Sequence, residues 1–195
     1  MNIPVNIFLC VATAMSKDTT RYILNGIEVT PKKNGVTLCA TNGMVIIAGY
    51  VGGENKIENP FIIPAHLVNY ITAKTKMLEM GIANKTVSLN TGFTDFRATV
   101  IDGNYPNWRK TIKPTGDLIE HMPKGMSRQV LDVIFKAQAA LEIKNRGISD
   151  VYCEDDRSNI GTHYMKLADD VVCAFAPLRG NSDDVRKFVW PDWAA

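Results

Sequence analysis

The sequence predicts an α+β fold made of three similar units, each with one helix followed by an antiparallel meander of short strands. An apolar residue and a proline precede each stretch of helical periodicity, at Pro4, Pro64 and Pro123, so the units repeat at spacings of 60 and 59 residues. Short β-rich segments separated by turn residues follow each stretch. The composition, with 46% hydrophobic and 22% charged residues among 195, is that of an ordinary globular protein. We expect the helices to cover one face of the sheets.

The first unit is expected to contain three strands, over residues 21–30, 35–41 and 44–51. Asn34-Gly35 and Asn42-Gly43 separate these strands, and Asn-Gly pairs favour tight hairpin turns. A third pair, Asn25-Gly26, lies within the first strand. We interpret Gly26 as a bulge or a close backbone approach, because a turn there would leave a very short strand.

The second and third units follow the same plan. In the second helix, the residues expected to face the sheet are Leu67, Val68 and Ile71. In the third, the expected apolar stripe is Val130, Leu131, Ile134 and Phe135. The strands expected after these helices span residues 86–91, 96–102, 149–155, 160–167 and 171–178. Residues 113–120 contain the Pro and Gly typical of a linker between units.

Charge and cysteine content narrow the classes of function. The net charge is only +2, so any contact with DNA depends on where the charges lie. Four cysteines lie far apart among apolar residues, which indicates reduced thiols and a cytoplasmic protein. His66, His121 and His163 show no ligand spacing, so we expect no metal site and no cofactor. No apolar run approaches the roughly 20 residues that a membrane helix needs, and residues 2–16 lack the basic start of a signal peptide.

An acidic cluster offers one enzymatic alternative. Glu154, Asp155 and Asp156 could hold Mg²⁺ in a nuclease. They stand between two expected strands, however, where Asp and Ser are common turn formers. The sequence has neither of the two common glycine-rich phosphate loops and no nucleophile within a motif. We therefore expect a protein that is not an enzyme.

Several segments carry a family resemblance. Residues 16–49 contain R-Y-I-L-N-G and, further on, A-T-N-G-M-V-I-I-A. Residues 100–114 read VIDGNYPNWRKTIKP, and residues 127–140 and 163–180 read SRQVLDVIFKAQAA and HYMKLADDVVCAFAPLRG. In this order, the segments resemble the second domain and the last half of the third domain of the bacterial DNA polymerase III beta subunit, the DNA sliding-clamp family.

The resemblance implies a sliding-clamp fold, in which each domain contains two helix-plus-strand units and several domains close into a ring. It implies a complete domain at residues 1–115, from units 1–53 and 54–115, then a half domain at 116–180 and a tail at 181–195. Helices that line such a ring hold double-stranded DNA by its phosphates, without reading sequence. The candidates for this contact are Lys17, Lys74, Lys76, Arg128, Lys136, Lys144 and Arg146.

The family also implies a hydrophobic cleft that takes short peptides from replication proteins. Its walls would be Arg21, Ile23, Leu24, Thr41, Gly43, Val45, Ile46, Pro106, Lys110, Thr111, Ala176, Pro177, Leu178 and Arg179. The chain departs from the family at residues 42–46, where Asn-Gly-Met-Val-Ile replaces Asp-Gly-His-Arg-Leu, and at residues 176–179, where a methionine-rich ending is lost. In the tail, Phe188, Trp190 and Trp193 are aromatics that we expect to dock on the protein's own groove or on a neighbour's.

Two hypotheses of function follow from the resemblance. In the first, the protein is a sliding-clamp-like processivity and recruitment factor, a homo-oligomer around duplex DNA that binds replicative polymerase or clamp-loader peptides. In the second, it is a clamp-derived interaction or decoy protein that binds replication proteins without encircling DNA. A nuclease at the acidic turn is the weaker third hypothesis.

Overall fold

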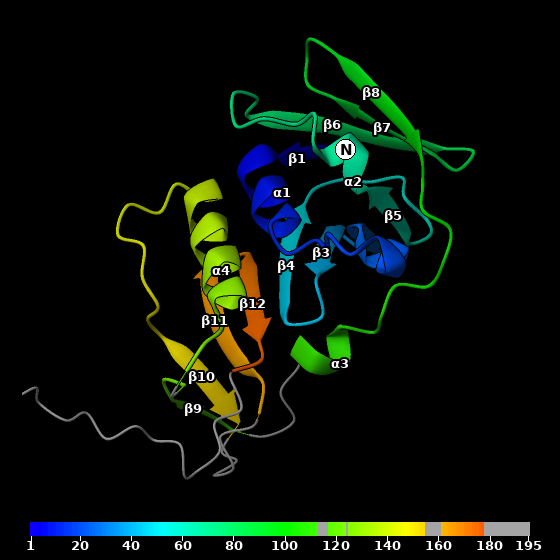
Figure 1. Cartoon of the computed structure of the whole chain (residues 1–195). Coiled ribbons are helices and arrows are strands. Elements are labelled where there is room, and N and C mark those ends of the chain that lie inside the picture. The colour runs from blue at the N-terminus through cyan, green and yellow to red at the C-terminus, as the bar shows by residue number, and fades with distance from the viewer. Residues whose placement is uncertain (113–116, 124, 155–160, 178–195) are drawn as a thin grey trace, which may run out of the picture.

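The computed structural model describes residues 1–112, 117–123, 125–154 and 161–177, which form two antiparallel sheets with helices beside them (Figure 1). The smaller sheet has the strand order β1 (Asn2–Pro4), β6 (Met77–Ala83), β7 (Thr86–Asn90) and β8 (Asp95–Thr99). The larger sheet has the order β5 (Phe61–Pro64), β2 (Gly26–Lys32), β3 (Gly35–Thr41), β4 (Val45–Gly52), β12 (Val171–Phe175), β11 (His163–Ala168), β10 (Val151–Glu154) and β9 (Leu118–Glu120).

Two helices lie side by side on one face of the larger sheet, as Figure 1 shows. They are α1 (Val5–Ala12) and α4 (Arg128–Ala140). Ser127 caps α4, since its Oγ accepts a hydrogen bond from the Val130 N–H at 3.2 Å. The helices α2 (Ala65–Val68) and α3 (Arg109–Ile112) are single turns. The predicted α+β class is confirmed. The expected placement of helices on one face of the sheet is confirmed for α1 and α4.

The first two units exchange their opening strands. Pro4 ends β1 and directly precedes α1, while Pro64 ends β5 and directly precedes α2. Each of these strands leaves its own unit, because β1 pairs with β6 and β5 pairs with β2. The repeated prolines therefore mark the same structural position in the first two units, which is the junction between a strand and the helix that follows it. The third unit differs, since Pro123 is buried and lies before the Ser127 cap of α4, and β9 pairs within its own unit.

The third unit joins the first through backbone pairing between β12 and β4. Ala174 lies opposite Ile46, and Phe175 lies opposite Val45. Beyond the strand, the Ala176 N–H donates to the Met44 carbonyl oxygen at 3.0 Å. This pairing makes one continuous sheet of eight strands, and it places the end of β12 beside the β3–β4 turn.

The hydrophobic core lies between the helices and the sheets. Phe8 of α1 and Ile134 of α4 are fully buried in it. All four cysteines are buried and free of disulfides, as predicted. Burial raises the pKa of Cys10 to about 12, so that thiol stays protonated at neutral pH. Across the described ranges, every helix is too short or too polar to pass through a bilayer.

The expected strand at 21–30 is wrong in its first half. Residues Thr19–Leu24 form a 3₁₀ helix, whose cap Asp18 accepts a hydrogen bond from the Thr20 N–H at 2.9 Å. The strand β2 begins only at Gly26. The close approach is confirmed, because a methyl group on Gly26 would overlap the Ile63 carbonyl oxygen and lie 2.8 Å from Ile62 Cγ2.

Three further expectations need correction. The second helix ends at Val68, so Ile71, which was expected on its sheet-facing side, lies beyond it, and Lys74 and Lys76 lie in the connection to β6, a strand that was not predicted. Residues Leu118–Glu120 of the expected linker form the edge strand β9. On α4, Val133 and Ala137 take the core-facing places expected for Leu131 and Phe135, and Phe135 remains 39% exposed. α4 packs on α1, and its buried residues belong to the same core cluster as those of α1.

Gly26→Ala is expected to destabilise the protein by about 1–3 kcal/mol, the cost of overpacking a closely packed site. The added methyl group meets backbone, which cannot rotate out of the way. Gly147→Ala is the matched control, because a Cβ there has no neighbour within 4 Å. Urea unfolding of both variants measures the difference, and equal midpoints would show that β5 moves freely away from β2.

Candidate peptide cleft and basic face

The β3–β4 turn is held by its own side chains. Thr41 Oγ1 donates to the Val45 carbonyl oxygen at 2.8 Å and accepts from the Gly43 N–H at 3.1 Å. Asn42 Oδ1 accepts from the N–H groups of Met44 and Val45, both at 2.9 Å. Gly43 has a φ of 91°, a left-handed conformation that favours glycine. The turn is therefore a rigid wall for whatever lies beside it.

The segment after β8 covers the outer face of the larger sheet. Trp108 packs on Cys39 and Ala48, which lie in register with Glu28 on the neighbouring strands. Its Nε1–H donates to the buried Glu28 Oε2 at 2.6 Å. Arg109 stacks on the Trp108 ring at 4.2 Å and lies 3.6 Å from the same carboxylate oxygen. A buried carboxylate thus ties this segment to β2.

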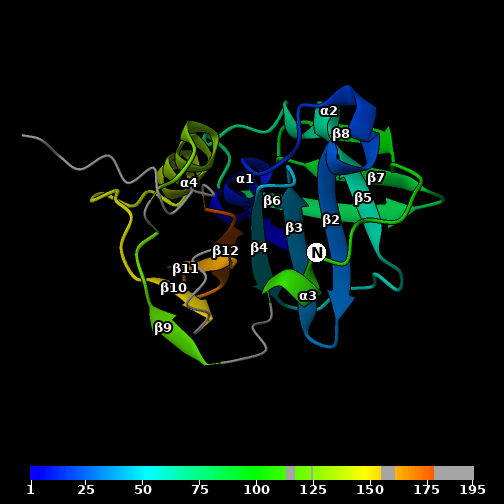
Figure 2. The same ribbon diagram turned by 60° about the horizontal axis from the view of Figure 1, so that its bottom comes forward.

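Tyr105 joins the same segment to the turn. Its hydroxyl oxygen accepts a hydrogen bond from the Thr41 N–H at 3.0 Å. Burial raises the pKa of Tyr105 well above its ordinary value, so the phenol stays protonated. Figure 2 shows α3, the end of this segment, close to β3 and β4.

A cavity of about 320 Å³ opens where the turn, the covering segment and the end of β12 meet. Seven residues predicted for the peptide cleft line it: Leu24, Thr41, Gly43, Ile46, Pro106, Thr111 and Ala176. They come from the 3₁₀ helix, the β3–β4 hairpin, the covering segment and the residue after β12. The fold therefore brings together positions up to about 150 residues apart in the sequence.

Other predicted cleft residues lie outside this cavity. Arg21 stands at its rim, since a Cβ on Gly43 would lie 2.9 Å from Arg21 Nη1. Ile23 faces Gly103, and Val45 is fully buried in the core. Lys110 is exposed on α3 and Pro177 is half-buried, and neither lines the cavity. Leu178 and Arg179 lie outside the described residues, as does the aromatic tail.

Sequence reasoning missed six lining residues: Met44, Asn107, Trp108, Thr162, Ala174 and Phe175. All of them except Thr162 stand inside the segments that carry the family resemblance, so the sequence contained a signal for five of the six. Ala174 and Phe175 reach the cavity only because β12 pairs with β4. That pairing has no local signal in the sequence.

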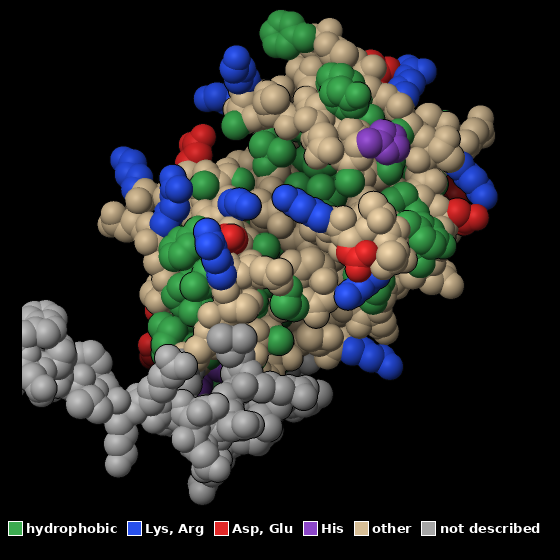
Figure 3. Space-filling view, viewed as in Figure 1, with side chains coloured by type: hydrophobic (Ala, Val, Ile, Leu, Met, Phe, Trp, Pro, Cys, Tyr) green, Lys and Arg blue, Asp and Glu red, His purple; other side chains and the backbone are tan. Residues whose placement is uncertain are grey.

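The predicted DNA-contact residues lie at or near the two packed helices. Arg128 and Lys136 are exposed on α4, and Lys144 and Arg146 are exposed just after it. Lys76 shares a small cavity with residues of α1 and with the end of α4, which include Val5 and Ala140. Lys17 and Lys74 are exposed in the connections after α1 and α2. Figure 3 shows Lys and Arg side chains over this face, with some acidic ones between them.

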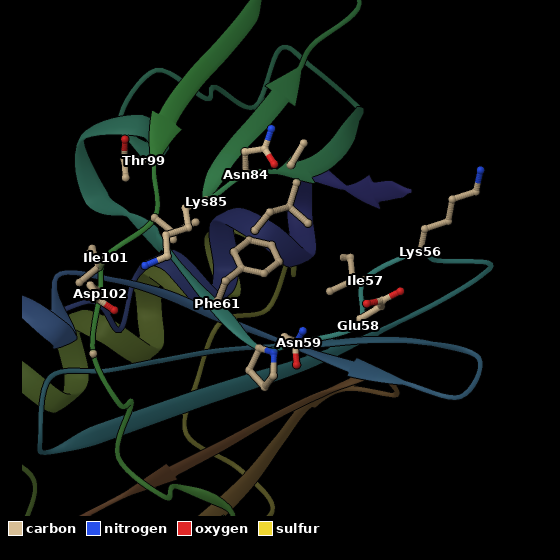
Figure 4. Close-up of a pocket in the computed structure, with 15 residues that line it drawn as sticks. Lys56, Ile57, Glu58, Asn59, Phe61, Asn84, Lys85, Thr99, Ile101 and Asp102 are labelled. Atoms are coloured by element: carbon tan, nitrogen blue, oxygen red, sulfur yellow. The ribbon is translucent and has the colours of Figure 1, made fainter.

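A larger cavity, of about 730 Å³, lies elsewhere. Figure 4 shows Phe61 in it, with the charged side chains of Lys56, Glu58, Lys85 and Asp102 around. It contains none of the predicted cleft or DNA-contact residues.

Two clusters of side chains are relevant to metal binding, the predicted acidic cluster and a cluster of two histidines with one cysteine. Of the acidic cluster, Asp155 and Asp156 lie outside the described residues, so the Mg²⁺ hypothesis stays a prediction. The structure does bring His121, Cys153 and His163 together, with their ligand atoms within 4.8 Å of one another. Their places in the sequence showed no ligand spacing.

Paired helices on one face, sheets that continue from unit to unit and the exchanged opening strands define the fold of a DNA sliding clamp. A family model described as the central domain of the DNA polymerase III beta subunit matches residues 6–107. This match covers more than half of the chain, and the chain belongs to that family. No curated protein matches the chain.

Solved structures of DNA polymerase III beta subunits have a similar fold. The beta chain from Streptococcus pneumoniae matches with a TM-score of 0.65 and 13% identity, over 92% of this chain and 64% of that one. The subunit from Pseudomonas aeruginosa matches with a TM-score of 0.66 and 13% identity, over 92% and 66%. The Bartonella birtlesii sliding clamp, bound to griselimycin, matches with a TM-score of 0.62 and 14% identity, over 92% and 66%. The chain thus spans about two thirds of the length of each of these clamps.

Proposed function

We propose that this protein is a non-catalytic, sliding-clamp-like processivity and recruitment factor of the cytoplasm. The observation that carries the proposal is the cavity beside the β3–β4 turn, because it gathers seven residues that the family resemblance had assigned to a peptide cleft. The proposed ligand is a short peptide segment of a replicative polymerase or of a clamp loader.

The lining suits a peptide with apolar anchor side chains. Leu24, Ile46 and Phe175 offer apolar surface, and Trp108 adds an aromatic wall. Thr111 contributes a polar side chain that can orient a peptide backbone, whereas the Thr41 hydroxyl is already used within the β3–β4 turn. Aromatic and aliphatic pockets of this kind give most of the binding free energy in peptide recognition. The expected complex is therefore held by one or two buried anchors.

For DNA, the proposed surface is the face that carries α1 and α4. Lysine and arginine side chains on a helical face bind phosphates without reading bases, as a sliding protein requires. Because the net charge is only +2, the contact depends on this local concentration of cations. One member is partly neutralised, since Arg128 Nε lies 4.0 Å from the Asp132 carboxylate.

The double variant Lys76→Gln/Lys136→Gln is expected to weaken retention on duplex DNA and to reduce the salt dependence of binding. Each lost phosphate contact lowers the slope of log K against log salt concentration by about 1, so the double variant loses about 2. Lys32→Gln/Lys33→Gln, in the β2–β3 hairpin, is the matched control with the same change in net charge. Fluorescence anisotropy over a salt series measures the slopes, and equal slopes in the two variants would exclude this face.

Ring formation is the step that separates the two hypotheses. In the described part of the chain, the outer edges of β8 and β9 carry no partner strand, so copies can join there. A ring of several copies would stay on nicked circular DNA and slide off after the circle is cut. A protein that captures polymerase or clamp-loader peptides, yet is monomeric in light scattering and shows no such difference, would be the interaction protein of the alternative hypothesis.

A further inference from the structure

Cys153 and His163 lie in the neighbouring strands β10 and β11 at one end of the larger sheet, and His121 comes directly after the edge strand β9. Cys153 of β10 lies directly opposite His163 of β11. His121 follows β9, and its N–H donates to the Val151 carbonyl oxygen at 2.8 Å. Because alternate residues of a strand point to the same face, Val151 and Cys153 share a face, and the register places His121 on it as well. The sheet itself therefore holds the three side chains together.

The separation of the two histidines matches that of a pair of metal ligands, and the cysteine sulfur lies close to both. His121 Nδ1 and His163 Nε2 are 3.3 Å apart. Two nitrogens bound to tetrahedral Zn²⁺ at about 2.0–2.1 Å from the ion stand about 3.3–3.4 Å apart. With a Zn–S bond of about 2.3 Å, the sulfur stands about 3.6 Å from each nitrogen. Since all three ligand atoms lie within 4.8 Å of one another, a side-chain movement of about 1 Å completes the geometry.

The tautomer of His163 is also suited to an ion. Its Nδ1 lies 3.1 Å from the Gly161 carbonyl oxygen, which can only accept, so Nδ1 carries the hydrogen and Nε2 presents its lone pair towards His121. An outer hydrogen bond of this kind orients metal-ligating histidines generally.

We propose that His121, Cys153 and His163 bind one divalent transition-metal ion of the Zn²⁺ type, with a fourth position open to water or to another ligand. Nitrogen and thiolate ligands favour Zn²⁺ over hard ions such as Mg²⁺ and Ca²⁺. The ion would link β9, β10 and β11. It would thereby stabilise β9, a strand of three residues at the sheet edge whose side chains are all exposed.

The alternative is a simple hydrogen bond from the Nδ1–H of His121 to His163 Nε2 in a partly buried cluster. It accounts for the 3.3 Å separation without an ion. Metal binding by the purified full chain separates the two interpretations, and the result does not depend on peptide or DNA binding.

Co²⁺ is the probe, since its bound thiolate gives a charge-transfer absorption band and its tetrahedral complexes absorb strongly in the visible. Titration of the metal-free protein is expected to reach one Co²⁺ per chain, displaced by one Zn²⁺. His121→Ala is expected to weaken binding by tenfold or more, and Cys153→Ser to remove the charge-transfer band. His66→Ala and Cys39→Ala are the controls, because both residues lie outside the cluster and both variants should bind normally.

Thermal unfolding gives a second readout. At a hundredfold excess over the dissociation constant, Zn²⁺ is expected to raise the melting temperature of the unmodified chain by roughly 5–10 °C and that of His121→Ala far less. His121 is only partly buried, so this variant is expected to fold even where Cys153→Ser does not. Absence of Co²⁺ binding at micromolar concentrations, or binding that survives both substitutions, would overturn the proposal.

Discussion

Leu24→Asp is expected to remove partner-peptide binding while leaving retention on DNA intact. Leu24 ends the 3₁₀ helix and lines the cleft, so the substitution places a carboxylate among apolar groups. Loss of a central anchor contact costs about 2 kcal/mol or more, which corresponds to a weakening of about 30-fold or more. Anisotropy of a fluorescent peptide from a replicative polymerase or a clamp-loader subunit measures the affinity.

Because Leu24 is also largely buried, a second variant separates binding from folding. Met44→Glu changes a 36% exposed side chain at the mouth of the same cavity, with little cost to the core. Met77→Glu, on the exposed face of β6, introduces the same charge away from the cleft. Weakened peptide binding in Met44→Glu but not in Met77→Glu supports the cleft. If neither Leu24→Asp nor Met44→Glu changed the affinity for the peptide, the peptide would bind elsewhere. If Leu24→Asp abolished both peptide binding and DNA binding, Leu24 would have a structural role in the core only.

Local patterns in the sequence predicted the hairpins of the first unit well. The expected strand over residues 35–41 has the observed bounds of β3, and Asn34-Gly35 and Asn42-Gly43 lie at the expected turns. Backbone requirements explain this success, since an Asn-Gly pair suits a tight turn whatever surrounds it. Asn25-Gly26 shows the limit of the pattern. There the glycine is needed because β5 passes close to it, and β5 lies more than 30 residues away in the sequence.

Pairings between distant strands account for most of what was missed. The short strands β1 and β5 precede the helices and look like helix starts, and only their exchange between units gives them partners. The pairing of β4 with β12 brings Phe175 into the cleft, and the pairing of β9 with β10 brings His121 to Cys153. Family resemblance supplied seven cleft positions because it carries such tertiary information. It could not supply the histidine cluster, which depends on the register of this chain's own strands.

Glu28→Ala is expected to reduce stability by about 2–3 kcal/mol and to loosen one wall of the cleft. The substitution leaves the buried Trp108 Nε1–H without its 2.6 Å acceptor and removes the anion that Arg109 approaches at 3.6 Å. Charge-assisted hydrogen bonds of this kind contribute about 1.5–3 kcal/mol, and a buried donor left without an acceptor adds to the loss. In a chain of this size, the melting temperature should fall by roughly 5–10 °C.

Two comparisons show whether the carboxylate acts through its charge, its hydrogen bond or neither. Glu28→Gln keeps an acceptor for Trp108 but loses the ion pair, so its stability should lie between those of the parent and Glu28→Ala. Glu79→Ala removes an exposed carboxylate from β6 and should change stability by less than about 0.5 kcal/mol. If Glu28→Ala were no less stable than Glu79→Ala, the covering segment would be held by packing on Cys39 and Ala48 alone. Because Trp108 also lines the cleft, Glu28→Ala should weaken peptide binding even at temperatures where the variant is fully folded.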